Sequence, residues 1–83
     1  MEKKSMTAYA FIGEKVVKSA FEDCGYENIV VVASEIKEVE DNNVCVIGAY
    51  MTLFKGVIER GAFKIYCNPQ NCEWFGLTNT KIL

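Results

Sequence analysis

The chain has 83 residues, of which 51% are hydrophobic and 12% aromatic, and its formal net charge is −2. This length supports one α+β domain, which we place at residues 6–83 after a flexible N-terminus at 1–5, and the composition excludes a disordered protein. The charges form no basic stripe, so direct binding to nucleic acid is not expected. No apolar run suits a signal peptide or a transmembrane segment, and we therefore expect a soluble, cytoplasmic protein that does not bind membranes.

The first predicted element is a helix at 14–24, where apolar residues recur at spacings of three and four. Gly25 follows as a natural stop, because glycine tolerates the left-handed conformation that ends a helix. Residues 6–12 either extend the helix backward through Gly13, which costs about 1 kcal/mol, or form a strand. The helical spacing of apolar residues continues through 6–12, which favours the helix.

Beyond Gly25 the sequence becomes typical of β-structure. The β-branched run NIVVVAS at 28–34 predicts a strand, and the more polar EIKEVE at 35–40 predicts an exposed continuation or an edge. The DNN triplet at 41–43 is a turn signal. The most apolar run of the chain, 44–54, comes next.

A hairpin centred on Lys55 and Gly56 is the preferred interpretation of residues 44–67. Cross-strand partners then have numbers that sum to 111, and large residues stand opposite glycines. One face of this hairpin is almost wholly apolar, as a buried sheet face should be. It carries Val44, Val46, Tyr50, Phe54, Val57, Phe63, Ile65 and Cys67. A short helix at 53–60, capped by Thr52 and ended by Gly61, stays open as the alternative.

The C-terminal part predicts one more turn and one more strand. Pro69 suits the first central position of a turn at 68–71, and residues 72–78 read as the last strand. The expected fold class is therefore α+β, with one N-terminal helix packed on an antiparallel meander of four to five strands.

The second face of the predicted hairpin is also apolar, although one helix covers only one face of a sheet. Large exposed apolar patches usually mark contacts between molecules. We therefore predict a homo-oligomer whose interface includes Ile47, Met51 and Leu53. Coverage of this face by the terminal segments or by a foreign partner stays open as the alternative.

The four cysteines do not show the paired spacing of a structural zinc site, and the chain has no histidine. Cys24 and Cys45 lie in apolar patterns, where a thiol behaves as a small hydrophobic group. Cys67 and Cys72 flank a turn, so they are expected to be packed thiols at a hairpin end, with a conditional disulfide as the alternative. We expect no metal and no cofactor.

Charge is unevenly distributed along the chain. Residues 22–41 hold seven acids and one base, a local net of −6, whereas the rest of the chain has a net of +4. An acidic surface suits a basic protein partner, and aromatic side chains are frequent at interface hot spots. The predicted partner-binding residues are Glu35, Glu38, Glu40, Asp41, Trp74 and Phe75. Trp74 and Phe75 are adjacent, so on a strand they are expected to point to opposite faces. The alternative is that these acids form a solvated face that only keeps the protein soluble.

The sequence carries no catalytic motif, and we predict that the protein is not an enzyme and has no catalytic residues. The preferred function is a small protein-binding module, a stoichiometric inhibitor or accessory protein of the phage or mobile-element type that blocks a host defence protein. The alternative is an oligomeric small-ligand-binding protein with a pocket between subunits. A cysteine-based metal-binding or redox protein is the third hypothesis.

Overall fold

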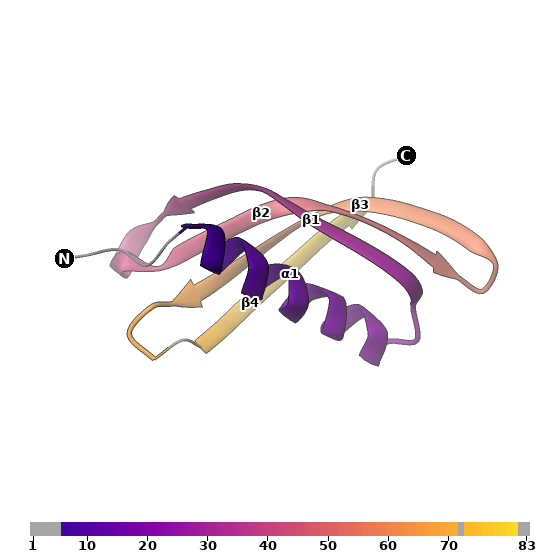
Figure 1. The fold of residues 1–83 in the computed structure, drawn as a ribbon, viewed down its shortest axis with the longest axis horizontal. Coiled ribbons are helices and arrows are strands. Elements are labelled where there is room, and N and C mark those ends of the chain that lie inside the picture. Colours follow the sequence, from indigo (N-terminus) through magenta and orange to yellow (C-terminus); the bar gives the residue numbers. More distant parts are fainter. Residues whose placement is uncertain (1–5, 72, 82–83) are drawn as a thin grey trace.

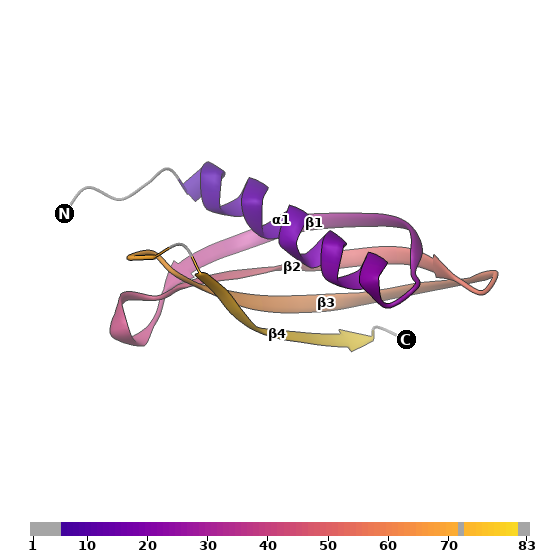
Figure 2. The ribbon, with the colours of Figure 1, turned by 90° about the horizontal axis from the view of Figure 1, so that it is seen from below.

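The computed structural model describes residues 6–71 and 73–81, with the backbone alone at 6, 7, 41, 54, 80 and 81. It has one helix, α1 (Met6–Asp23), packed on one side of a four-stranded antiparallel sheet with strand order β1-β2-β3-β4. Figure 1 shows the sheet curving over α1, and Figure 2 shows α1 on one side of it. The predicted α+β class is confirmed. The proposed flexible N-terminus at 1–5 lies outside the described residues.

Helix α1 includes residues 6–12, so the preferred helical interpretation of that segment is confirmed. Its end has the hydrogen bonds of a Schellman motif. The N–H of Tyr26 donates to Phe21 O over 3.1 Å, the N–H of Gly25 donates to Glu22 O over 3.0 Å, and Gly25 has a φ of 91°. The rings of Phe21 and Tyr26 lie 5.2 Å apart, which is the apolar contact that commonly accompanies this motif.

Strands β2 (Val44–Phe54) and β3 (Val57–Asn68) form the predicted hairpin. Every partner pair, from Val44 with Cys67 to Phe54 with Val57, has the predicted register. Lys55 and Gly56 have φ angles of 52° and 80°, which gives the two-residue turn whose twist matches antiparallel strands. The alternative helix at 53–60 is therefore wrong.

Glycines stand opposite aromatic residues in this hairpin, as predicted. A Cβ atom on Gly48 would overlap the ring of Phe63, its cross-strand partner, and also the carbonyl oxygen of Val32 on β1. Tyr50 pairs with Gly61 in the same hairpin. The hairpin thus depends on glycine at a position where two strands and a ring converge.

Strand β1 (Glu27–Glu38) pairs with β2 and is interrupted by register shifts between Glu27 and Val30 and between Ala33 and Glu35. Side chains from other elements bond to the backbone at both places. The Thr52 hydroxyl donates to Glu27 O over 2.7 Å, and Glu14 Oε2 on α1 accepts from the N–H of Ala33 over 2.7 Å. A short 3-10 helix, η1 (Glu40–Asn42), makes the turn expected at 41–43.

Strand β4 (Glu73–Lys81) is longer than the predicted strand at 72–78 and completes the sheet. It also carries a register shift, opposite the stretch between Lys64 and Tyr66 of β3, and Gly76 there has a φ of 74°. The turn before it contains a hydrogen bond of 2.9 Å from the N–H of Gln70 to Asn68 Oδ1. Both edge strands of the sheet are therefore irregular.

The core lies between α1 and the face of the sheet that it covers, which we call the covered face. It consists of Tyr9, Val17, Phe21, Ile29, Val44, Val46, Tyr50, Phe63, Ile65 and Cys67. Val57 was predicted on this buried face, but its side chain is 59% exposed. The reason is that the β2–β3 hairpin projects past the end of α1, as Figure 2 shows. The side chain of Phe54 lies outside the described part of the chain.

Candidate association surface

The face of the sheet opposite α1 is apolar over much of its area, and no described element lies on it (Figure 2). We call it the open face. The strand register assigns to it Val30, Val32, Ile47, Ala49, Met51, Leu53, Ile58, Ala62, Tyr66 and Phe75. All four strands contribute side chains to this face. On each strand every second residue belongs to it, and the alternation changes phase at each register shift.

Large apolar side chains on the open face are accessible to solvent. Val30, Val32, Met51, Ile58 and Phe75 have exposed fractions of 52%, 55%, 44%, 64% and 45%. Four of these side chains lie in neighbouring rows of β1, β2 and β3 and form a cluster, unlike the scattered single residues that are normal at a protein surface: Val30, Val32, Met51 and Ile58. Phe75 is exposed further along the same face, beside Tyr66. This cluster is the outstanding feature of the described surface.

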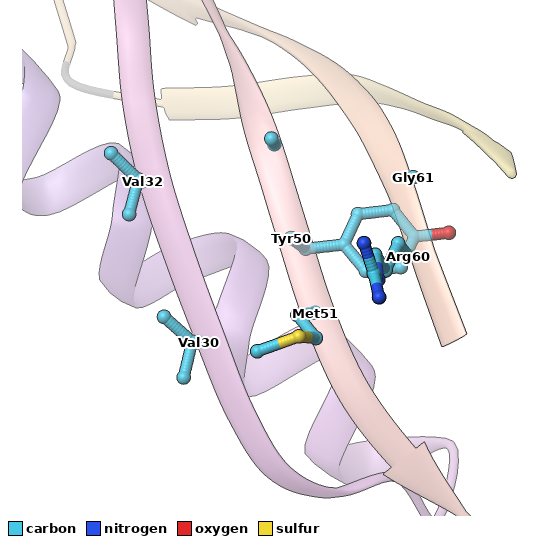
Figure 3. A pocket seen from close by; sticks show the side chains of 7 residues that line it. Val30, Val32, Tyr50, Met51, Arg60 and Gly61 are labelled. Atoms are coloured by element: carbon cyan, nitrogen blue, oxygen red, sulfur yellow. The ribbon is translucent and has the colours of Figure 1, made fainter. Parts of the chain in front are cut away.

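A shallow concavity of about 250 Å³ lies within the open face. Val30, Val32, Ala49, Met51 and Arg60 contribute to its lining, together with Tyr50 and Gly61. Figure 3 shows the Met51 side chain extending toward β1, where Val30 and Val32 lie. The concavity is smaller than the roughly 300–1,000 Å³ of typical small-molecule sites. Its shape and apolar lining suit a side chain of another molecule better than an enclosed ligand.

Charged residues border this apolar cluster and have both signs. Glu35 and Lys37 on β1 and Arg60 and Lys64 on β3 are exposed and have open-face registers. Glu35, Ile47 and Lys64 form one row across three neighbouring strands, with the acid and the base on either side of the isoleucine. The open face therefore combines an apolar centre with opposite charges in a defined order.

The sequence-predicted oligomer residues Ile47, Met51 and Leu53 all lie on the open face. Met51 is exposed, and the other two are half-buried. The structure therefore brings these three residues together, next to the valines of β1 and Ile58 of β3.

The sequence-predicted partner-binding residues are divided between several surfaces. Glu35 and Phe75 lie on the open face, where the Phe75 ring stacks on Tyr66 at 6.0 Å. Glu38 and Glu40 are exposed where β1 ends and η1 begins, and the side chain of Asp41 lies outside the description.

Trp74 is on the covered face and half-buried against α1, where a Cβ atom on Gly13 would lie 3.2 Å from the indole ring. The expectation that adjacent Trp74 and Phe75 point to opposite faces is therefore confirmed.

Sequence reasoning missed the contribution of β1 to the open face. Val30 and Val32 alternate as they should in a strand, but the register shift after Ala33 then moves Glu35 to the open face and Ile36 to the covered face. Alternation alone would give the opposite assignment. The only local signal is Ser34, a short polar residue whose hydroxyl donates to Ile47 O over 3.3 Å.

The cysteines do not gather into a site. Cys45 and Cys67 are buried on opposite faces of the hairpin, and Cys24 is exposed after α1. Cys72 lies outside the described residues, so the predicted relation between Cys67 and Cys72 is not described either. Among residues 6–71 and 73–81, no group of three metal-ligating side chains is placed to hold an ion.

Comparisons with known proteins add no assignment. No protein-family model, no curated protein and no solved structure matches this chain. Within the described segments, no helix has both the length and the apolar character needed to cross a bilayer.

Proposed function

We propose that this protein is a non-catalytic protein-binding module whose binding surface is the open face of the sheet. The observation that carries the proposal is the cluster of exposed apolar side chains formed by Val30, Val32, Met51 and Ile58, with Phe75 exposed further along the same face. Each of these side chains is about half exposed, so complete burial would contribute about 1 kcal/mol per residue. A partner that covers the open face would gain this contribution at several places at once.

The two edges of the sheet are less suitable for association than its face. An unpaired edge strand invites pairing with another chain, and bulges counter this by twisting and interrupting the edge. Here β1 has two register shifts and β4 has one. The irregular edges favour side-chain contacts through the face over backbone pairing along an edge.

The mode of action we propose is stoichiometric occupation of a partner surface, as in an inhibitor or accessory protein of the phage or mobile-element type that blocks a host defence protein. The end of the sheet where β1 meets η1 has acidic side chains on one side, namely Glu35, Glu38 and Glu40. Phe75 lies on the other side of the same end. This combination of acid and aromatic side chains supports a partner with a basic surface. In this mode the acidic and aromatic end of the sheet would contact the host protein, and the apolar centre of the open face would remain available for pairing with a second copy of the chain.

Site-specific photo-crosslinking in the producing cells tests this proposal. A photoreactive residue in place of Met51, at the centre of the open face, is expected to give a covalent adduct with protein. The same residue in place of Lys18, which is exposed on α1, is the matched control and should give none. Adducts at Lys18 alone, or none at either position, would contradict the proposal.

A second candidate is the oligomeric small-ligand-binding protein, which the concavity beside Arg60 favours. Arg60 contributes to the lining of this apolar depression, and an arginine beside such a depression suits an organic anion. Native mass spectrometry of the protein purified gently from its producing cells separates the two candidates. Retained mass that matches a small organic molecule would favour this second function, and a bare multiple of the chain mass would favour the first.

A further inference from the structure

We propose that the partner on the open face is a second copy of this chain, bound face to face about a two-fold axis that runs along β2. This inference rests on the proposed function, because it uses the same open face, and adds the identity and orientation of the occupant. The order of residues across the sheet determines this orientation.

The row Glu35–Ile47–Lys64 has the symmetry that such a pair requires. β1 and β3 flank β2 on its two sides. A two-fold axis in the interface plane, directed along β2, therefore places β1 of one copy over β3 of the other. Glu35 then meets Lys64 of the second copy, Lys64 meets the second Glu35, and the two Ile47 side chains meet at the axis. One contact thus forms two ion pairs around an apolar centre.

The rows on either side of this one are compatible with the same axis. Val32, Ala49 and Ala62 form the next row, so small apolar residues meet there. Val30, Met51 and Arg60 follow, which places the aliphatic stem of arginine against valine. In the opposite direction, Lys37 and Tyr66 flank Cys45, and the ammonium group meets an aromatic ring. No row brings like charges together.

The usual geometry of packed sheets preserves these pairs. Two aligned sheets cross at about 30° because each is twisted. β1 and β3 lie about 4.8 Å from the axis. This crossing angle therefore displaces their residues by only about 2.5 Å relative to the partners in the second copy. The long side chains of Glu35 and Lys64 can span such a displacement. Within one chain the Cα atoms of the two residues are two strand spacings apart, about 9.6 Å, and Ile47 lies between them.

The area that two copies would share fits a weak dimer. With the axis along β2, β1 to β3 of each copy overlap and β4 lies outside, so three strands about 4.8 Å apart and about 11 residues long, at about 3.3 Å per residue, share roughly 520 Å² per copy. Weak and transient interfaces bury less than about 600 Å² per partner. A face of a single charge sign would repel its own copy, whereas opposite charges on β1 and β3 make this one complementary to itself.

A charge-exchange experiment tests this arrangement. The Glu35→Lys and Lys64→Glu variants are purified under reducing conditions, one of them labelled with ¹⁵N, and their assembly is measured by sedimentation and native mass spectrometry. Each variant alone would place two like-charged pairs across the axis, so its dimer Kd should rise at least about tenfold. In an equal mixture, the residue introduced at position 35 of one chain faces the residue introduced at position 64 of the other. The unchanged Lys64 of the first chain faces the unchanged Glu35 of the second, so both pairs again have opposite charges. The mixture should therefore form mixed dimers with nearly the original Kd.

The matched controls are Glu22→Lys and Lys18→Glu, which change the net charge equally at exposed positions of α1. They should dimerise as the original chain does. The inference is overturned if the original chain is monomeric up to roughly 100 µM, above the Kd of weak interfaces. It is also overturned if the two variants dimerise as tightly alone as together. A monomeric chain that still crosslinks at Met51 to a different protein would overturn self-pairing while leaving the proposed function intact.

Discussion

Glu14 Oε2 on α1 accepts a 2.7 Å hydrogen bond from the backbone N–H of Ala33, at the point where β1 shifts its register with β2. A bulge leaves backbone groups without ladder partners, and a buried group without a partner costs free energy. The Glu14 carboxylate supplies the missing acceptor from a different element. The helix and the irregular strand are therefore stabilised by the same bond.

The first prediction concerns this bond. Glu14→Ala should lower the free energy of unfolding by about 1–3 kcal/mol, because the half-buried N–H of Ala33 loses its acceptor. Glu14→Gln retains an acceptor oxygen and should cost less. Urea unfolding measures both changes, and Glu22→Ala, at an exposed position of the same helix, is the control. Equal effects of Glu14→Ala and Glu22→Ala would show that the bond does not stabilise the fold.

Thr52 provides a second prediction, at the other register shift of β1. Its side chain is 2% exposed and donates to Glu27 O. Thr52→Val keeps the shape but removes the donor, and should lower the free energy of unfolding by about 1–2 kcal/mol. Thermal unfolding compared with Thr78→Val, an exposed change in β4, is the measurement. If Thr52→Val is as stable as the Thr78 control, the hydroxyl is dispensable.

Two glycines allow a contrast between lack of space and backbone strain. Gly48→Ala should abolish folding or cost more than about 3 kcal/mol, because its Cβ atom would overlap Val32 O and the Phe63 ring. Gly56 has a φ of 80° and open space around it. Gly56→Ala should therefore cost only about 1–2 kcal/mol, the penalty of the left-handed conformation. Chemical denaturation measures the loss of stability in both variants. A larger loss for Gly56→Ala than for Gly48→Ala would contradict the prediction and show that β1 moves away from position 48 at little cost.

Gly13 and Trp74 should be energetically coupled. An alanine within α1 ordinarily stabilises the helix by about 1 kcal/mol relative to glycine, but a Cβ at Gly13 would lie 3.2 Å from the indole ring. We expect most of that gain to be absent in Gly13→Ala and to return when Trp74→Leu removes the ring. The free energies of unfolding of the four chains in this double-mutant cycle should give a coupling of at least about 0.5 kcal/mol. Additive effects would contradict the contact.

The β2–β3 hairpin was predictable because its information is local. Lys55 and Gly56 form a two-residue turn, and such a turn sets the register of the strands on both sides. The end of α1 was predictable for the same reason, since Gly25 acts on the residues next to it. Both elements could therefore be predicted from local sequence, without information about distant parts of the chain.

The faces of β1 were not predictable from alternation, because a bulge is decided by tertiary contacts. The shift after Ala33 accompanies the close approach of β1 to Gly48 and the bond from Glu14. It determines that Glu35 joins the open face. Likewise, the sequence showed that Trp74 and Phe75 diverge, but only the position of Gly13 shows why the tryptophan belongs to the core.

The pairing of aromatic residues with glycines in the hairpin also controls errors during folding. Phe63 pairs with Gly48, and Tyr50 pairs with Gly61, whose strand the Tyr50 ring reaches in Figure 3. A slip of two residues in one direction would oppose the two rings, and a slip in the other would oppose the two glycines. The first error would place both rings in one row of the covered face, and the second would leave one row of that face without side chains. A hairpin that has closed in the correct register has therefore excluded its two nearest misregistered pairings by means of the side chains of its own two strands.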